Sequence, residues 1–375
     1  MDYWLQNYLL SFSISVILSG LILPNIMNIA FRRKLFDDVS ERKIHRGVVP
    51  RLGGFAFLPA LIFSFCVVIG CNFRFSPGLM TTALDGTIVP VFFLLCSLML
   101  MYVVGLADDL IGVRYRAKFV LQIITGILIV MSGCWIHSLD GLFMIHDVPT
   151  ILGWSATVFL VVYVVNAINL IDGIDGLASG LCIIALGYYS YIFFTAGIYV
   201  YSFLAAATMG SLMPFFYFNV FGSAENHTKI FMGDTGSLTI GVMLSFLTLE
   251  VFCMPPNTTP AGENIFILAV APIMLPCFDV IRVFFHRVKR RTNPFLPDKC
   301  HIHHKMLALG YRQRSALIII LAADALFILF NILASPYIPP TAIFLADILG
   351  WTLINVAITH LIRIRERNIG ASLYN

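Results

Sequence analysis

Residues 152–170, LGWSATVFLVVYVVNAINL, form an apolar run without a single charged side chain. A bilayer core of roughly 30 Å requires about 20 apolar residues in a helix, so this run has the length of one membrane crossing. Ten further runs of this kind lie near 8–30, 53–71, 86–107, 118–137, 177–196, 197–219, 236–254, 264–285, 316–334 and 341–362. Because the runs 177–196 and 197–219 nearly touch, the sequence predicts ten or eleven membrane helices.

The composition of the whole chain agrees with this interpretation. Of its 375 residues, 59% are hydrophobic and only 12% are charged, and the mean hydropathy is +0.89. A water-soluble core of this length cannot bury so much apolar surface without exposing large patches. The eight cysteines lie mostly inside apolar runs and show neither disulfide nor zinc-pair spacing, so we interpret them as small core residues. We expect residues 1–375 to form a single all-α polytopic membrane domain.

Lysine and arginine are distributed unequally between the two ends of the predicted helices. If the eleven runs are numbered from the N-terminus, the segments that follow the odd-numbered runs hold 23 of the 24 basic residues. Only Arg74 lies on the other side. The positive-inside rule therefore predicts an external N-terminus and a cytoplasmic C-terminus. The first run is too long for a signal-peptide core and is followed by basic residues, so we expect a retained helix. Cytoplasmic loops are expected near 31–52, 108–118, 171–176, 220–235 and 286–315.

Side chains that could bind metal ions or phosphate all fall on the predicted cytoplasmic side. Carboxylates at a membrane boundary are costly unless they are solvated, paired or bound to metal, so a convergent set indicates a functional site. The set comprises Asp108, Asp109, Asn166, Asn169, Asp172, Asp175, Asp234, His301, His303 and His304.

The segment 166–180, NAINLIDGIDGLASG, carries four of these oxygen donors at intervals of three residues. On a helix they would line one face, and the two Asp-Gly pairs favour a turn in which the backbone approaches a ligand. Oxygen donors of this type suit Mg²⁺ held jointly with phosphate. The alternative is a solvated helix end capped by Asn and Asp.

Asp108 and Asp109 end a predicted helix and are followed by Lys118. Next to the segment 166–180, the two carboxylates are candidates for a general base and a metal ligand. Lys118 is a candidate for neutralising phosphate. The alternatives are a solvated aspartate turn and a lysine that extends along the membrane surface.

The segment 231–237, FMGDTGS, precedes another predicted helix. Its glycines free backbone N–H groups, and Asp234 is a candidate cation ligand that would face a pyrophosphate. Phe231 is a candidate for stacking on a base. Simple helix capping and an aromatic anchor at the membrane interface are the alternatives.

The histidines of 301–304, HIHH, lie in the longest basic loop. With Cys300 they raise the possibility of zinc, but all the donors come from one short segment without a second Cys/His pair. Their basic neighbours favour imidazoles that donate to phosphate, although several of those neighbours are expected only to anchor the cytoplasmic side. The neighbours are Arg287, Lys289, Arg290 and Arg291.

Five segments together resemble the polyprenyl-phosphate N-acetylhexosamine-1-phosphate transferases, in the WecA/TagO branch that is related to MraY. They are HRGVVPRLGG (45–54), GLADDLIGVRYRAKF (105–119), NAINLIDGIDGLASG (166–180), IFMGDTGSLTIG (230–241) and PCFDVIRVFFHRVKRRTNPFLPDKCHIHH (276–304). The HIHH ending resembles the WecA/TagO branch, since MraY proteins carry three consecutive histidines. The resemblance runs from about residue 43 to residue 310. It implies ten or eleven helices around a cytoplasmic cleft and dependence on Mg²⁺, with Mn²⁺ as a substitute.

The resemblance also implies roles for individual residues. Asn169 and Asp234 match metal-contacting positions, and Asp108 and Asp109 match an essential pair, one member of which would deprotonate the lipid phosphate. Asp172 and Asp175 are further catalytic candidates. The residues assigned to phosphate or substrate binding are Lys118, His301, His303, His304, Phe231, Asn219, His45 and Arg51. The segment from 219 to 234 is longer than in MraY, and the first motif leaves the roles of His45 and Arg51 undefined.

The implied reaction transfers a sugar-1-phosphate from a UDP-sugar to polyprenyl (undecaprenyl) phosphate and releases UMP, as the first step of a cell-surface glycan. UDP-GlcNAc is the expected donor, with UDP-GalNAc or a deoxy-amino sugar as alternatives. Direct attack by the lipid phosphate and an aspartyl-phosphate intermediate both remain open. The expected location is the plasma (inner) membrane of a bacterium. No nucleic-acid partner is expected, and a homodimer is one alternative for the oligomeric state.

A lipid-linked sugar flippase or another transporter is the rival interpretation. Asp324 and Asp347 lie within predicted membrane helices, where acids mark ion paths. Pro272 and Pro276 interrupt the run 264–285, as in the broken helices of transporters. The polar set lies at one face instead of mid-membrane, which favours the enzyme.

Overall fold

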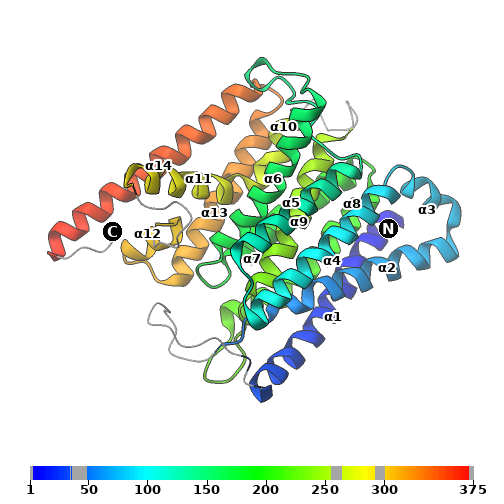
Figure 1. The fold of residues 1–375 in the computed structure, drawn as a ribbon, viewed down its shortest axis with the longest axis horizontal. Coiled ribbons are helices and arrows are strands. Elements are labelled where there is room, and N and C mark those ends of the chain that lie inside the picture. Colours follow the sequence, from blue (N-terminus) through cyan, green and yellow to red (C-terminus); the bar gives the residue numbers. More distant parts are fainter. Residues whose placement is uncertain (1–2, 34, 36–48, 255–263, 292–299, 371–375) are drawn as a thin grey trace.

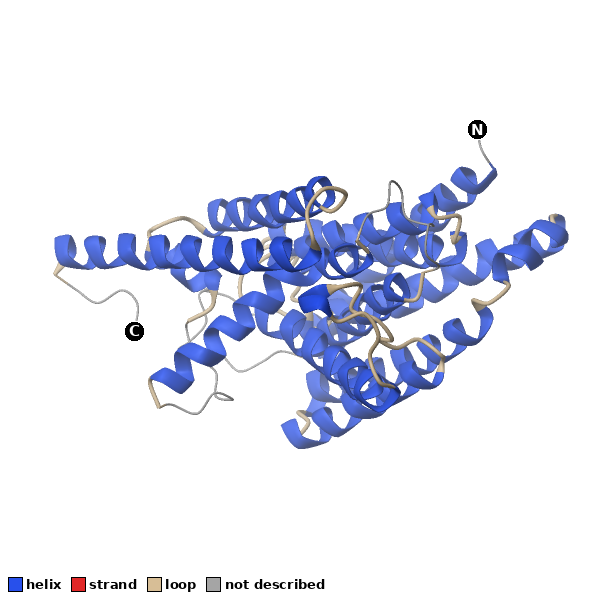
Figure 2. Cartoon of the chain, turned by 90° about the horizontal axis from the view of Figure 1, so that it is seen from above, coloured by secondary structure: helices blue, strands red, loops and turns tan. Residues whose placement is uncertain are grey.

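The computed structural model describes residues 3–33, 35, 49–254, 264–291 and 300–370. Regular structure in these residues is helical (Figure 2), apart from one isolated bridge between Ser138 and Asp147. The helices are α1 (Tyr3–Arg33), η1 (Gly53–Ala56), α2 (Phe57–Phe75), α3 (Pro77–Leu84), α4 (Ile88–Ile111), α5 (Tyr115–Met131), η2 (Leu142–Met144), α6 (Thr150–Ile171), α7 (Leu177–Thr195), α8 (Tyr199–Phe221), α9 (Gly233–Phe252), α10 (Ile265–Val270), η4 (Ala271–Ile273), α11 (Met274–Lys289), α12 (Ile302–Ala308), α13 (Gln313–Ala334) and α14 (Pro340–Ile369).

Ten segments of the described chain have the length and apolar character of a membrane crossing, if η1–α2 and α10–η4–α11 each count as one. Helix α5 corresponds to the predicted run 118–137. Its 17 residues extend about 26 Å, and it packs against both α4 and α6. The prediction of an all-α polytopic membrane protein with ten or eleven helices is therefore confirmed. The expected interruption at Pro272 is present as η4, because this proline lies in the 3-10 turn between α10 and α11.

The contact between α1 and α8 shows how helices associate in an apolar solvent. Ser11, Ser15 and Ser19 repeat every four residues on the buried face of α1. Their hydroxyl groups donate to the carbonyl oxygens of Phe203, Ala207 and Ser211, at 3.1, 2.6 and 2.7 Å. Small side chains allow close approach, and the hydrogen bonds hold the two helices together. In these turns the inward face of α1 is thus polar, whereas large apolar side chains such as Ile17 and Leu21 are exposed.

Helix α9 lies at the centre of the bundle, with α1–α4 at one side and α13 and α14 at the other (Figure 1). All its residues from Thr235 to Phe252 are buried. Helix α4 approaches it closely because position 105 is glycine: a Cβ on Gly105 would lie 2.4 Å from the Cα of Thr235. Helices α4 and α6 end, and α5, α7 and α9 begin, at one end of the bundle, which we call the site face.

Candidate active site

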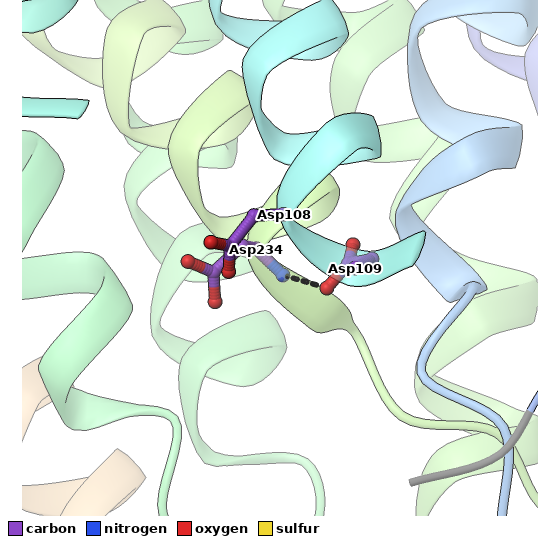
Figure 3. A group of neighbouring side chains, drawn as sticks. All are labelled: Asp108, Asp109 and Asp234. Atoms are coloured by element: carbon purple, nitrogen blue, oxygen red, sulfur yellow. Dashed lines mark hydrogen bonds between the residues drawn. The ribbon is translucent and has the colours of Figure 1, made fainter. Parts of the chain in front are cut away.

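Three carboxylates lie together at the site face (Figure 3). Asp108 and Asp109 belong to the last turn of α4, and Asp234 is the second residue of α9. One oxygen from each lies within 4.8 Å of the other two. Among the described residues this is the only group of three or more His, Cys, Asp or Glu donors that close together. Such a concentration of negative charge requires a cation nearby.

Lys118 supplies a positive charge to this group from the first turn of α5. Its ammonium nitrogen lies 2.9 Å from Oδ1 of Asp108 and 2.7 Å from Oδ2 of Asp234. The three side chains are about one-fifth to one-quarter exposed. The structure therefore joins three predicted site residues, from segments far apart in the sequence, into one ion-paired group.

Asp109 is oriented differently from the other two carboxylates (Figure 3). Its Oδ1 accepts a hydrogen bond from the backbone N–H of Asp234, at 2.8 Å. Its Oδ2 accepts from both the backbone N–H and the hydroxyl of Thr235, at 2.9 and 2.6 Å. Gly233 makes this contact possible, because its φ is +71° and a Cβ there would lie 2.5 Å from the carboxylate. Asp109 thus holds the first turn of α9 and thereby positions Asp234.

Asn169 connects α6 to the same group. Its Nδ2 donates to Oδ1 of Asp234 at 3.2 Å and to Oγ of Ser237 at 2.8 Å. The two residues that were predicted to contact metal are thus in direct contact with each other. Mg²⁺ prefers oxygen ligands. The carboxylates of Asp108 and Asp234 and the amide of Asn169 fit such an ion.

The four donors of segment 166–180 do not share one helical face, because α6 ends at Ile171. Asn166 turns away from the carboxylates and donates to Oε1 of Gln122 at 2.7 Å. Asp175 accepts from the ammonium group of Lys229 at 2.5 Å. Only Asn169 and Asp172 therefore face the carboxylate group.

Asp172 follows α6 directly and caps its C-terminal end. Its side chain reaches solvent, but protein atoms surround it, and this enclosure together with the charges of Asp175 and Asp234 raises its pKa to about 7. Arg51 acts in the opposite direction on this pKa. Asp172 therefore lies among like charges that a bound cation would relieve.

The histidines approach the turn after α6 from the start of α12. The ring of His303 covers Gly173, since a Cβ on that glycine would lie 2.0 Å from Nε2. His303 is buried, and both its ring nitrogens lack a hydrogen-bond partner among the described residues. Burial and the neighbouring His304 lower its pKa to about 3, so the ring is neutral. The ring of His304 lies 4.2 Å from that of His303.

His301 is held by Asp279, a buried residue of α11. Nδ1 of His301 lies 2.9 Å from Oδ2 of Asp279. An ionised carboxylate only accepts, so Nδ1 carries the proton and Nε2 remains for another partner. Asp279 also accepts from Arg282 at 2.7 Å and from the backbone N–H of Ile302 at 3.2 Å. This one carboxylate therefore fixes the start of α12 and the orientation of His301.

The remaining predicted residues occupy other positions. The amide of Asn219 is buried and bonds the backbone of Gly176 and Ile230, at 2.6 and 2.8 Å. Phe231 is half-buried, with the ammonium of Lys229 lying 5.9 Å from its ring centroid. Arg51 is exposed, and His45 lies outside the described residues.

Two residues that support this site were not predicted from the sequence. Asp279 stands in PCFDVIR (276–282), where one acid inside an apolar run was the available signal. Lys229 is the single basic residue of the segment 220–235, and nothing in its local pattern indicates that it pairs with Asp175. Both residues act by holding predicted site residues in place.

Residues 91–252, which include the carboxylate group and Lys118, match the protein family described as glycosyl transferase family 4. A Bacillus subtilis (strain 168) protein described as a probable undecaprenyl-phosphate N-acetylglucosaminyl 1-phosphate transferase is 29% identical over 331 residues, which cover 87% of this chain and 85% of that protein. An Escherichia coli (strain K12) undecaprenyl-phosphate alpha-N-acetylglucosaminyl 1-phosphate transferase is 26% identical over 87% of this chain and 86% of its own length. The Yersinia pestis protein of the same description is 26% identical, over 81% and 78%.

Proposed function

Residues 91–252 match glycosyl transferase family 4, and on that premise we propose that the chain transfers N-acetylglucosamine-1-phosphate from UDP-N-acetylglucosamine to undecaprenyl phosphate. An oxygen of the lipid phosphate attacks the β-phosphorus of the donor. The bond from that phosphorus to the bridging oxygen breaks, and UMP leaves. The observation that carries the proposal is the carboxylate group of Asp108, Asp109 and Asp234 with Lys118 at its centre, in a chain similar to relatives with this named activity.

Mg²⁺ is the metal that we propose for this site, with Mn²⁺ as a substitute. Asp108 and Asp234 would hold it, because their oxygen atoms lie together at the site face, and the amide of Asn169, which contacts Asp234, would supply a third oxygen ligand after turning its oxygen toward the ion. When bound, the ion supplies positive charge to the diphosphate oxygens on which negative charge develops.

The side chains around the carboxylates perform the remaining tasks. Lys118 presents an ammonium group that neutralises phosphate. Neutral His303 presents an imidazole N–H that donates to the donor diphosphate. His301, whose Nδ1–H is held by Asp279, donates from Nε2 as the imidazolium. A general base for the lipid phosphate makes a minor contribution near pH 7, where most of that phosphate is ionised. Asp109 positions Asp234 without contact to substrate.

We propose that the site face lies in the cytoplasm of a bacterium, where UDP-sugars are made. The excess of lysine and arginine in segments at this end of the helices supports that orientation. Arg363, Arg365 and Arg367 at the end of α14 are examples. The product would then be the first lipid-linked intermediate of a cell-surface glycan.

The test is UMP release by purified protein with undecaprenyl phosphate, Mg²⁺ and UDP-GlcNAc, UDP-GalNAc or a UDP-deoxy-amino sugar in parallel. We expect release that requires lipid, stops on chelation, is fastest with UDP-GlcNAc and is lost in Asp234→Asn. Arg116→Gln is the matched control, since Arg116 lies in the same turn of α5 as Lys118 but is exposed and, among the described residues, bonds only to Tyr115.

Faster UMP release with another UDP-sugar would support the same reaction class but identify a different donor. No release from any donor, by protein that is folded and supplied with competent lipid, would refute the transferase. Transport of a lipid-linked sugar would then be tested next, starting from Asp324, whose carboxylate oxygens are buried without a hydrogen-bond partner among the described residues.

A further inference from the structure

Two cysteines lie next to each other at the end of the bundle opposite the site face. Cys134 follows the end of α5, and Cys253 caps the end of α9. Their sulfur atoms are 3.5 Å apart, although 118 residues separate them in the sequence. A disulfide has a sulfur separation of about 2 Å, so each sulfur needs to move by only about 0.7 Å.

The surroundings hold both cysteines in this position. The backbone N–H of Ile136, two residues after Cys134, donates to the hydroxyl of Thr157 in α6 at 2.9 Å. The sulfur of Cys253 lies 3.8 Å from the carbonyl oxygen of Trp135. The segment after α5 is therefore fixed against α6 and against the end of α9, and it keeps the two thiols facing each other.

We propose that Cys134 and Cys253 form a disulfide bond on the external side of the membrane. The proposal rests on the orientation proposed above, because external and periplasmic compartments are oxidising whereas the cytoplasm is reducing. It does not depend on which sugar is transferred.

The two thiols differ in a way that suits stepwise oxidation. Cys134 is buried, whereas Cys253 is partly exposed. The hydrogen bond from Cys134 lowers the pKa of Cys253 to about 7, so a substantial fraction is thiolate at neutral pH. The Cys253 thiolate attacks a protein or small-molecule disulfide and releases one donor thiol. Cys134 then loses its proton and attacks the mixed disulfide at Cys253, which releases the second donor thiol. Two protein thiols are oxidised and one donor disulfide is reduced.

A disulfide here would fix the outer ends of two helices that carry site residues at their inner ends. Helix α5 begins beside Lys118 and α9 begins beside Asp234, and these two residues are ion-paired at 2.7 Å. Helices α4 and α6 each pack against both α5 and α9. Helices α5 and α9 would thus be linked at one end by an ion pair and at the other end by a covalent bond, with α4 and α6 packed against both.

A zinc site is the other chemistry that two adjacent thiols suggest. Structural zinc requires four ligands. Within the part of the chain that the structure describes, three or more close donors occur only at Asp108, Asp109 and Asp234. His137 and Glu250 interact with the two thiols, but no group of three close donors among the described residues includes the two sulfur atoms, which favours the disulfide.

The experiment counts thiols in the full-length protein in membranes of cells with an oxidising exterior. Cells are quenched in acid, denatured in detergent, alkylated, and then treated with reductant and a maleimide of high mass. We expect two thiols per wild-type chain to become reactive only after reduction, and none in the Cys134→Ser/Cys253→Ser double variant. Cys66→Ser is the matched control and should keep both, because Cys66 is exposed on α2.

A measurement on the unmodified protein makes the result independent of how the variants fold. Non-reducing proteolysis and mass spectrometry should recover a peptide that joins Cys134 to Cys253, and reductant should lower the melting temperature of wild type but not of the double variant. Eight free thiols in wild type, or one zinc ion per chain that the double variant loses, would overturn the disulfide. UMP release is measured separately, so either result is distinguishable from failure of the transferase.

Discussion

The ammonium group of Lys118 lies 2.7 Å from a carboxylate oxygen of Asp234 and 2.9 Å from one of Asp108. These two carboxylates are also the ones that are best placed to bind a divalent cation. The lysine therefore acts as a counter-ion within the proposed metal site. Binding of a metal requires the two carboxylates either to release the ammonium group of Lys118 or to contact it and the metal together.

The first prediction concerns Lys118→Met. Loss of the ammonium group leaves two carboxylates facing each other, so Mn²⁺ binding, measured by electron paramagnetic resonance, should tighten by up to about tenfold. UMP release should fall by about 100-fold or more, because a positive charge that stabilises developing phosphate charge is lost. Arg116→Met should change neither quantity. Weaker Mn²⁺ binding in Lys118→Met would contradict the counter-ion role.

The second prediction separates the two adjacent aspartates. Asp109→Asn places an NH₂ group against hydrogen-bond donors of Asp234 and Thr235, so it should lower the free energy of unfolding by about 1–3 kcal/mol. Asp108→Asn should abolish turnover with a smaller change in stability, since its oxygen still accepts from the N–H of Val113. Thermal unfolding in detergent with a chelator compares the two. Equal losses of stability would refute the distinction.

The third prediction tests the contact between His303 and the turn after α6. In Gly173→Ala the new methyl group would lie 2.0 Å from Nε2 of His303 and displace the ring. A displacement of about 1 Å at a reacting site costs on the order of 100-fold in rate, so we expect a loss of about 10- to 100-fold in kcat/KM. The matched control is Gly187→Ala in α7, where the nearest atom would lie 3.7 Å away. Unchanged kinetics in Gly173→Ala would remove His303 from the site.

The fourth prediction uses the pKa of Asp172, which enclosure and neighbouring carboxylates raise to about 7. An aspartate whose pKa is raised on folding destabilises the fold when ionised, so its penalty is absent below about pH 4 and complete above about pH 7. With a chelator present, Asp172→Asn should therefore raise the melting temperature more at pH 8 than at pH 5.5. Added Mg²⁺ should reduce the difference.

Asp175→Asn provides a control of opposite sign for that experiment. Asp175 pairs with Lys229 at 2.5 Å, so its neutralisation breaks an ion pair and should lower the melting temperature at both pH values. An increase over wild type that is larger at pH 5.5 than at pH 8 for Asp172→Asn would contradict the raised pKa.

The helices were predictable because each apolar run had to cross a bilayer. An uncharged run such as 152–170 has few stable structures there other than a helix. Helix α5 illustrates the strength of this constraint, since its run at 118–137 was visible although the helix has only 17 residues. The serine repeat at 11, 15 and 19 was not recognised as an interface, because hydropathy does not show which face of a membrane helix is buried. That property depends on the shape and hydrogen bonding of a partner helix.

The site was predictable where the chemistry of a side chain is unusual for its location. Acids at a membrane boundary drew attention to Asp108, Asp109 and Asp234, and the structure brings them together. Pairings across the fold were not accessible, because they depend on which helix ends meet. The ion pair between Asp175 and Lys229 and the contact of Asp279 with His301 are of this kind.

The enclosure of α9 has a consequence for how the protein is made. Of the elements of the described chain that pack most closely against it, η1, α4, α6, α7 and α8 precede it in the sequence, and α10 follows. During synthesis from the N-terminus, most of the surrounding shell therefore enters the membrane before α9 leaves the ribosome. Asp234 meets Asp108 and Lys118 only when that late helix inserts among its neighbours. A nascent chain that stops before Gly233 would hold seven of the eleven crossing segments of the described chain, if α5 is counted, but would lack Asp234 and therefore a complete catalytic centre.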